Sequence, residues 1–251
     1  MSQKLTEHAS IRTNPPLGFR LTTREIDLLE FVLDQKFAGT DALYIRFFQG
    51  EGSKSPRYAV ERLQLLSKCG FLRPKRVYTE PKSYYLATDL AQTTLQSLRP
   101  DRTISEPPTE IDFRTFEHDK RVTMCRASRE KKGEVKEWLS ERRLKQEWTA
   151  ANGYRLSREY MPDAIYTNGA GGRVAFELEL SPKTRERHVK KVSRFLEVMR
   201  HMDGAFSRTL FVACSKPVYE MLLSVTRPYK EFKVTRFEEI VLENEKGKKN
   251  V

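Results

Sequence analysis

Apolar residues recur at intervals of three and four along the first third of the chain, which predicts a series of helices. Thr22 and Glu25 have the spacing of a capping box and open the first helix. A glycine-containing break then leads to a second helix over 41–48. Ser55 and Pro56 suit the N-cap and the first turn of a third helix.

Two short strands follow, over 71–78 and 83–87, and a turn containing proline separates them. Three helices, a hairpin and a last short helix over 89–98 make the order of a winged helix-turn-helix domain. The segment ERLQLLSKCGFLRPKR, residues 61–76, resembles the junction between the recognition helix and the wing of that family. The resemblance covers residues 20–98 and implies a DNA-binding domain.

The third predicted helix and the strand after it are strongly basic. Between Lys54 and Arg76 the chain has seven Lys and Arg residues and one acid, Glu61. Residues off the apolar stripe of the helix would face a major groove, and basic residues of the strand would contact phosphates. The alternative is a solvated basic face that serves protein contacts or dimerisation. The candidate DNA-binding residues are Arg57, Tyr58, Arg62, Gln64, Arg73, Lys75 and Arg76.

A proline-rich segment over 99–110 predicts a linker between two domains. The polar residues 1–19 predict a flexible arm, and the lysine-rich residues 241–251 predict a flexible tail. The expected organisation is therefore a winged helix domain over 20–98 and a second domain over 111–240.

Helical and strand-like patterns alternate in the second domain. The expected helices cover 111–129, 135–148, 184–202 and 218–225. The expected strands cover 161–166, 173–180, 207–214 and 232–237, with a further strand or loop at 154–157. This order predicts an α/β sheet of the restriction-endonuclease type, so the fold class expected for the whole chain is α+β.

Three acids lie around the first two of these strands. Glu177 and Glu179 are two residues apart in a strand whose other positions are apolar, so they project together from one face. If the strands pair, Asp163 joins them at one end of the hairpin. Gathered carboxylates repel one another unless a cation holds them, and Mg²⁺ prefers such oxygen ligands. The alternative is a solvated acidic face beside a basic helix.

The same residues resemble the motif of the PD-(D/E)XK nuclease superfamily. Pro162-Asp163 and Glu177 match it, and Glu179 stands where the superfamily usually has lysine, although some of its restriction enzymes have Glu or Gln there. The resemblance implies Mg²⁺ held by Asp163 and Glu177, with Glu179 in the catalytic set. Lys183 is the candidate to supply the missing cation. Because a carboxylate at 179 cannot lower the pKa of an attacking water, DNA binding without catalysis ranks above nuclease activity.

The start of the 111–129 helix offers further candidates. Glu117 could be the acid that nuclease-like domains often place on their first helix, or a surface glutamate. His118 beside Asp119 could move a proton or be structural, since no Ser or Cys nucleophile motif accompanies it. A basic stripe on the 184–202 helix faces either phosphates or solvent, and consists of Lys183, Arg187, Lys190 and Arg194.

Composition supports a polyanionic partner. The 251 residues carry a formal net charge of +12, which points to double-stranded DNA rather than a membrane, since no long apolar span or signal-peptide pattern is present. The three cysteines are far apart, so we expect free thiols and a cytoplasmic location.

The order of elements together with three segments resembles the replication-relaxation family of bacteria and their mobile elements. The segments are HDKRV (118–122), MPDAIY (161–166) and AFELELSPKTRERHVKKVSRFLE (175–197). The resemblance, over 20–215, implies a DNA-binding protein with a degenerate nuclease-like domain that assists or regulates replication, mobilisation or transcription of a plasmid or other mobile element. The alternatives are an Mg²⁺-dependent DNA endonuclease and a protein-interaction module. A homodimer, or a partner protein in a replication, transfer or transposition complex, stays open.

Overall fold

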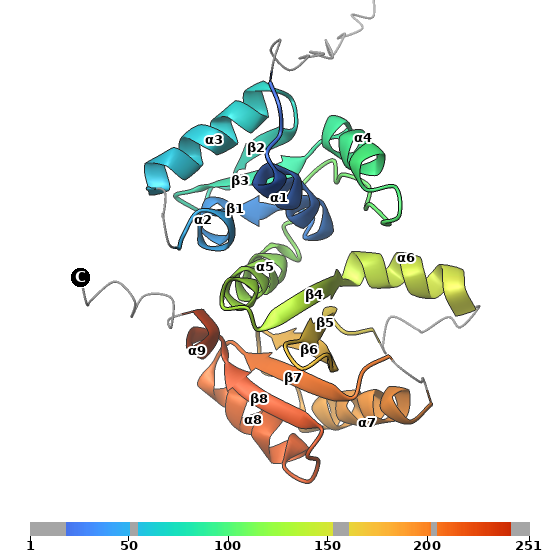
Figure 1. Cartoon of the computed structure of the whole chain (residues 1–251). Helices are drawn as coiled ribbons and strands as arrows, with labels where there is room; N and C mark the ends of the chain where they lie inside the picture. Colours follow the sequence, from blue (N-terminus) through green and yellow to red (C-terminus); the bar gives the residue numbers. More distant parts are fainter. Residues whose placement is uncertain (1–18, 51–54, 153–160, 202–204, 242–251) are drawn as a thin grey trace, which may run out of the picture.

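The computed structural model describes residues 19–50, 55–152, 161–201 and 205–241. Within them the chain forms two β-sheets with helices packed against each, which confirms the α+β class. In Figure 1 the smaller sheet and its helices lie above, the larger sheet lies below, and helix α5 lies between them. We call residues 19–98 the N-terminal part and residues 111–241 the C-terminal part.

The N-terminal part begins with three helices whose ends are set by local sequence. They are α1 (Thr23–Asp34), α2 (Thr40–Phe47) and α3 (Pro56–Lys68). The predicted capping box is present, since the Glu25 carboxylate accepts a hydrogen bond from Thr22 N at 2.9 Å while Thr22 Oγ1 accepts one from Glu25 N. Ser55 caps α3 by accepting a hydrogen bond from Tyr58 N at 3.2 Å. Gly70, with φ of +81°, then turns the chain out of α3.

A small antiparallel sheet packs against these helices. Its strands are β1 (Ala38–Gly39), β2 (Leu72–Arg76) and β3 (Ser83–Ala87), in the order β1-β3-β2. The predicted hairpin pairs β2 with β3, whereas the two-residue strand β1 had no signal in the sequence. Helix α4 (Asp89–Leu98) follows, and its N-cap residue Thr88 accepts a hydrogen bond from Ala91 N.

The C-terminal part is built around one five-stranded sheet. Its helices are α5 (Phe116–Lys131), α6 (Glu141–Asn152), α7 (Arg185–His201), α8 (Lys216–Thr226) and α9 (Phe237–Val241). Its strands are β4 (Val135–Ser140), β5 (Ala164–Asn168), β6 (Arg173–Glu179), β7 (Arg208–Ala213) and β8 (Phe232–Arg236), which lie in this order in the sheet. The strands β4, β5 and β6 are antiparallel, and β6, β7 and β8 are parallel.

Alternation along β6 sends its side chains to two different cores. Val174 and Phe176 pack in a cluster with Val122 of α5. Ala175 packs on the opposite face in a cluster with Phe195 of α7 and residues of α8. Glu177 and Glu179 share the parity of Ala175, so β6 aims both glutamates toward the face that α7 covers.

Helix α5 contributes to the cores of both parts. Phe116 stacks on Phe37, with ring centroids 5.5 Å apart, and meets Tyr84 edge-on at 5.1 Å. The predicted linker also packs against the N-terminal part, since Ile104 and Ser105 are buried and lie in the segment that follows α4. The two parts are therefore held together by apolar burial and not only by a covalent connection.

Two predictions of secondary structure need correction. The helix expected over 135–148 is wrong, because 135–140 is strand β4 and α6 begins at Glu141. The strand pairs with β5, and the ring of Trp138 packs on Tyr166 of β5 at 5.9 Å and on Phe176 of β6 at 5.1 Å. The helix expected from 111 begins only at Phe116. The element expected at 154–157, the arm up to residue 18 and the tail from residue 242 lie outside the described residues.

No helix in the described ranges combines the length and the apolar character needed to cross a membrane.

Candidate functional site

Asp163 immediately precedes β5, and two groups fix its carboxylate. Leu178 N donates a hydrogen bond to Asp163 Oδ2 at 2.8 Å, and His118 Nε2 lies 3.1 Å from the same oxygen. Since Leu178 lies between Glu177 and Glu179 on β6, this hydrogen bond brings Asp163 to the two glutamates. The three acids therefore converge at one end of the β5–β6 hairpin, where the sequence predicted them.

Glu177 and Glu179 are buried, with 6% and 1% of their surface exposed. The alternative of a solvated acidic face on the hairpin is therefore wrong. Burying an ionised carboxylate is costly unless a cation or hydrogen-bond donors compensate for the lost water. The buried position of the two glutamates thus requires positively charged partners nearby.

Those partners are lysines from α7 and from the segment before it. Lys191 Nζ donates to Glu177 Oε1 and, at 2.8 Å, to Glu179 Oε1. Lys183 Nζ lies 2.6 Å from the other oxygen of Glu179. The predicted cation, Lys183, does reach the acidic cluster, but Lys191 is the one that contacts both glutamates.

Opposing electrostatic effects give the two glutamates different proton affinities. Burial and the nearby charge of Asp163 raise the pKa of Glu177 to about 7, although Lys191 opposes the rise. Burial also raises the pKa of Glu179, but Lys191 and Lys183 outweigh it and hold that pKa below its usual value. Burial disfavours the charged form of Lys191, but the two carboxylates outweigh it and raise its pKa, so the ammonium stays charged. One glutamate can thus exchange a proton near neutral pH while its neighbour remains ionised.

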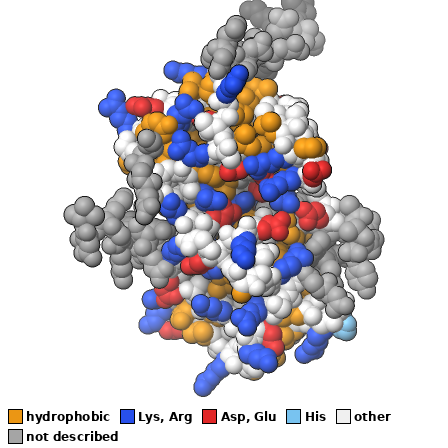
Figure 2. Space-filling model, in the orientation of Figure 1, with side chains coloured by type: hydrophobic (Ala, Val, Ile, Leu, Met, Phe, Trp, Pro, Cys, Tyr) orange, Lys and Arg blue, Asp and Glu red, His pale blue; other side chains and the backbone are white. Residues whose placement is uncertain are grey.

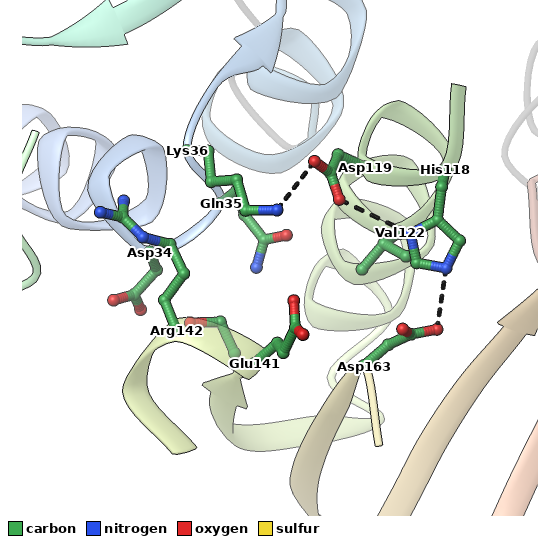
Figure 3. A pocket seen from close by; sticks show the side chains of 10 residues that line it. Asp34, Gln35, Lys36, His118, Asp119, Val122, Glu141, Arg142 and Asp163 are labelled. Carbon is green, nitrogen blue, oxygen red and sulfur yellow. Dashed lines mark hydrogen bonds and ion pairs between the residues drawn. The ribbon is translucent and has the colours of Figure 1, made fainter. Parts of the chain in front are cut away.

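His118 connects Asp163 to the N-terminal part. Its Nδ1 lies 3.5 Å from Asp119 Oδ1, and Asp119 Oδ2 lies 2.9 Å from the ammonium of Lys36 (Figure 3). Burial opposes the charging of His118, but Asp163 and Asp119 raise its pKa to about 11. These side chains line a small pocket of about 30 Å³, whose wall also includes Arg142.

The acidic cluster has a feature suited to a divalent cation. Glu177 Oε2 is buried and has no hydrogen-bond partner in the described part of the chain. An ion held between this oxygen and Asp163 would satisfy it, and Mg²⁺ commonly binds through one or two carboxylates with water and substrate phosphate completing the shell. Glu179 fits less well, because lysines bind both of its oxygens. No set of three or more His, Cys, Asp or Glu residues within the described ranges is arranged to hold a metal ion.

The other candidates from the C-terminal part lie at the edge of this site or outside it. Glu117 is not the helix acid of the site, since it is half exposed and pairs with Lys120 at 2.9 Å. In the basic stripe, Arg187 and Lys190 are exposed, whereas Lys183 pairs with Glu179. Sequence reasoning missed Lys191, which borders the buried positions His188, Val192 and Phe195 of α7 instead of facing the stripe, because its contacts depend on how α7 packs on the sheet.

The predicted DNA-binding residues divide into two groups. Arg57, Gln64, Arg73 and Arg76 are exposed and Lys75 is half-buried. Arg62 instead pairs with the buried carboxylate of Glu25 on α1, and Tyr58 packs edge-on against Phe48 at 6.1 Å. Arg62 and Tyr58 therefore hold α3 on the helices beneath it. Arg73 also donates a hydrogen bond to the carbonyl oxygen of Pro108 at 3.0 Å.

Lys and Arg side chains are spread over both the N-terminal and the C-terminal part of the face seen in Figure 2. Comparison with known proteins gives no relative: no family model, no curated protein and no solved structure matches the chain.

Proposed function

We propose that the protein binds double-stranded DNA through its N-terminal part, with α3 as the recognition helix of a winged helix and the β2–β3 hairpin as its wing. The observation that carries this proposal is the orientation of α3. Ala59, Leu63 and Leu66 are fully buried, while the side chain of Arg57 is 88% exposed and Gln64 also faces outward. A helix held in this way presents polar and basic groups to a major groove.

The wing supplies contacts to the DNA backbone, which do not distinguish one base sequence from another. Arg73 and Arg76 lie exposed on β2 with Lys75 between them, and these cations suit the phosphate backbone. The net charge of +12 favours such contacts at low salt. In a protein of the replication-relaxation type, this binding would assist or regulate replication, mobilisation or transcription of a plasmid or other mobile element.

A second candidate function is Mg²⁺-dependent cleavage of DNA, and Lys191 is the observation that favours it. Glu179 replaces the usual lysine of the motif, but Lys191 brings a cation to the same carboxylates. Asp163 and Glu177 would hold the ion, which when bound supplies an activated water and stabilises charge on the phosphate. Lys191 is placed to favour the same developing negative charge.

DNA binding is tested by fluorescence anisotropy with labelled duplexes, at several salt concentrations. We expect Arg57→Ala and Arg76→Ala each to weaken binding, and Lys233→Ala, which removes an exposed lysine of β8, to change it little. Equal affinities for the native protein and both arginine variants would overturn the proposal for α3 and the wing.

Cleavage is tested on supercoiled plasmid with Mg²⁺ or Mn²⁺. Metal-dependent nicking that is lost in Asp163→Asn, Glu177→Gln and Lys191→Met, but kept in Lys190→Met, would support the endonuclease. A plasmid that is retarded but intact with the native protein and with every variant would support DNA binding without cleavage.

A further inference from the structure

Lys36 has an unusual backbone conformation for its residue type. It follows the C-cap of α1 with φ of +68°, and in the part of the chain that the structure describes it is the one residue other than glycine with positive φ. The position after a helix C-cap often adopts this conformation, and glycine does so without steric cost. A lysine at this position therefore calls for a role of its side chain.

The Lys36 ammonium reaches from the N-terminal part to α5. It lies 2.9 Å from Asp119 Oδ2, which also accepts a hydrogen bond from Thr115 Oγ1 at 2.9 Å. The other oxygen of Asp119 lies 3.5 Å from His118 Nδ1, and His118 Nε2 lies 3.1 Å from Asp163 Oδ2. Figure 3 shows the side chains of Lys36, Asp119, His118 and Asp163 joined one to the next across the pocket.

The other charged groups of the pocket form their hydrogen bonds and ion pairs elsewhere, although Arg142 lies near enough to Asp119 to interact with it electrostatically. The Arg142 guanidinium donates to the carbonyl oxygen of Leu33 at 2.7 Å, and the Glu141 carboxylate pairs with Lys145 at 2.5 Å. Asp34 faces Arg126 at 3.4 Å. Lys36 is thus the cation of the N-terminal part that acts on Asp119.

We propose that Lys36 is a positioning residue for Asp163, acting through Asp119 and His118, so that the acidic site is complete only when the N-terminal part is docked on α5. A ligand that shifts α1 against α5 would then shift the Asp163 carboxylate as well. Lys36 would orient the Asp163 carboxylate in this way whether or not the site binds a metal.

The Leu178 amide offers a direct readout, because it donates its hydrogen bond to the Asp163 carboxylate. In the full chain labelled with ¹⁵N-leucine, we expect Lys36→Met to move the Leu178 amide proton upfield as this bond weakens. Lys36→Gly should do the same, although it relieves the backbone strain, and Lys36→Arg should restore the native position. Lys82→Met, which removes the exposed Lys82–Asp41 pair, is the control and should leave the signal unchanged.

An unmoved Leu178 signal in both Lys36→Met and Lys36→Gly would overturn the proposal. Combining Lys36→Met with Asp119→Asn shows whether Lys36 acts on Asp163 through Asp119 or independently of it. If Lys36 acts through Asp119, Lys36→Met adds little to the shift already caused by Asp119→Asn, whereas additive shifts would also overturn it. Neither result depends on DNA binding or on plasmid cleavage.

Discussion

Lys191 Nζ lies 2.8 Å from the Glu179 carboxylate, although the two residues are 12 positions apart and belong to different elements. The same ammonium also bonds to Glu177. The positive charge at this end of β6 thus comes from α7 and not from the strand itself. Lys191 therefore supplies a positive charge that the carboxylate of Glu179 cannot, and this contact favours cleavage as the second candidate function.

Replacing Lys191 with methionine should destabilise the C-terminal part. The change leaves Glu177 and Glu179 buried without their shared cation, which costs roughly 3 kcal/mol of unfolding free energy by comparison with other broken buried pairs. Urea unfolding at neutral pH measures this loss. Lys190→Met, at an exposed position one residue away, should change the unfolding free energy by less than about 0.5 kcal/mol. Equal losses in the two variants would show that the acids do not depend on Lys191.

Replacing two arginines of α3 should affect two different properties, DNA binding for Arg57 and stability for Arg62. Arg57→Ala should weaken duplex binding and lower the salt slope by about one, with little change in stability, because its side chain is 88% exposed. Arg62→Ala should instead cost about 2 kcal/mol of stability, since the carboxylate of Glu25 is buried and loses its charged partner. Anisotropy and urea unfolding on the same samples separate these effects. A stability loss in Arg57→Ala as large as that in Arg62→Ala would contradict this division.

Sequence patterns predicted the elements that have local signals. The helices α1 and α3 carry their caps in Thr22 and Ser55, and the β5–β6 turn carries Gly171 with φ of +86°. Strand β4 was missed because Trp138 fits a helical stripe as well as a strand, and the pairing of β4 with β5, where Trp138 stacks on Tyr166, selects the strand. Local periodicity cannot resolve such cases, since the deciding contact comes from a strand far along the chain.

The acids of the candidate site and the cation Lys183 were predictable from the sequence, whereas Lys191 and Lys36 were not. Asp163, Glu177 and Glu179 converge because hairpin pairing follows from the strands and the turn between them. Lys191 and Lys36 act from separate elements, so their contacts depend on how α7 and the N-terminal part pack. Helix packing involves side chains distant in sequence, and a single sequence does not reveal it.

Phe116 should couple the unfolding of the two parts. Its ring is buried between Phe37 and Tyr84 of the N-terminal part, although Phe116 itself begins α5. Phe116→Ala should cost roughly 3–5 kcal/mol and loosen this contact. Thermal unfolding followed by calorimetry should then change from one transition to two. Phe113→Ala is the matched control, because that ring is 70% exposed and its loss should leave one transition.

The pair formed by His118 and Asp163 should make stability depend on pH. Because the pKa of His118 is raised to about 11, the folded state binds a proton that the unfolded state releases above its ordinary pKa of 6.5. This stabilisation is complete below about pH 6.5 and is lost as the pH rises toward 11, with a slope of at most about 1.4 kcal/mol per pH unit. His118→Gln removes this titration, so the native protein should lose stability faster than the variant between about pH 7.5 and 9. Glu177, whose pKa is about 7, is still partly protonated at about pH 7.5 and is essentially ionised by about pH 9, so the slopes are compared at the upper end of this range. Urea unfolding across this range measures both slopes, and parallel slopes would show that His118 is not charged through its contact with Asp163.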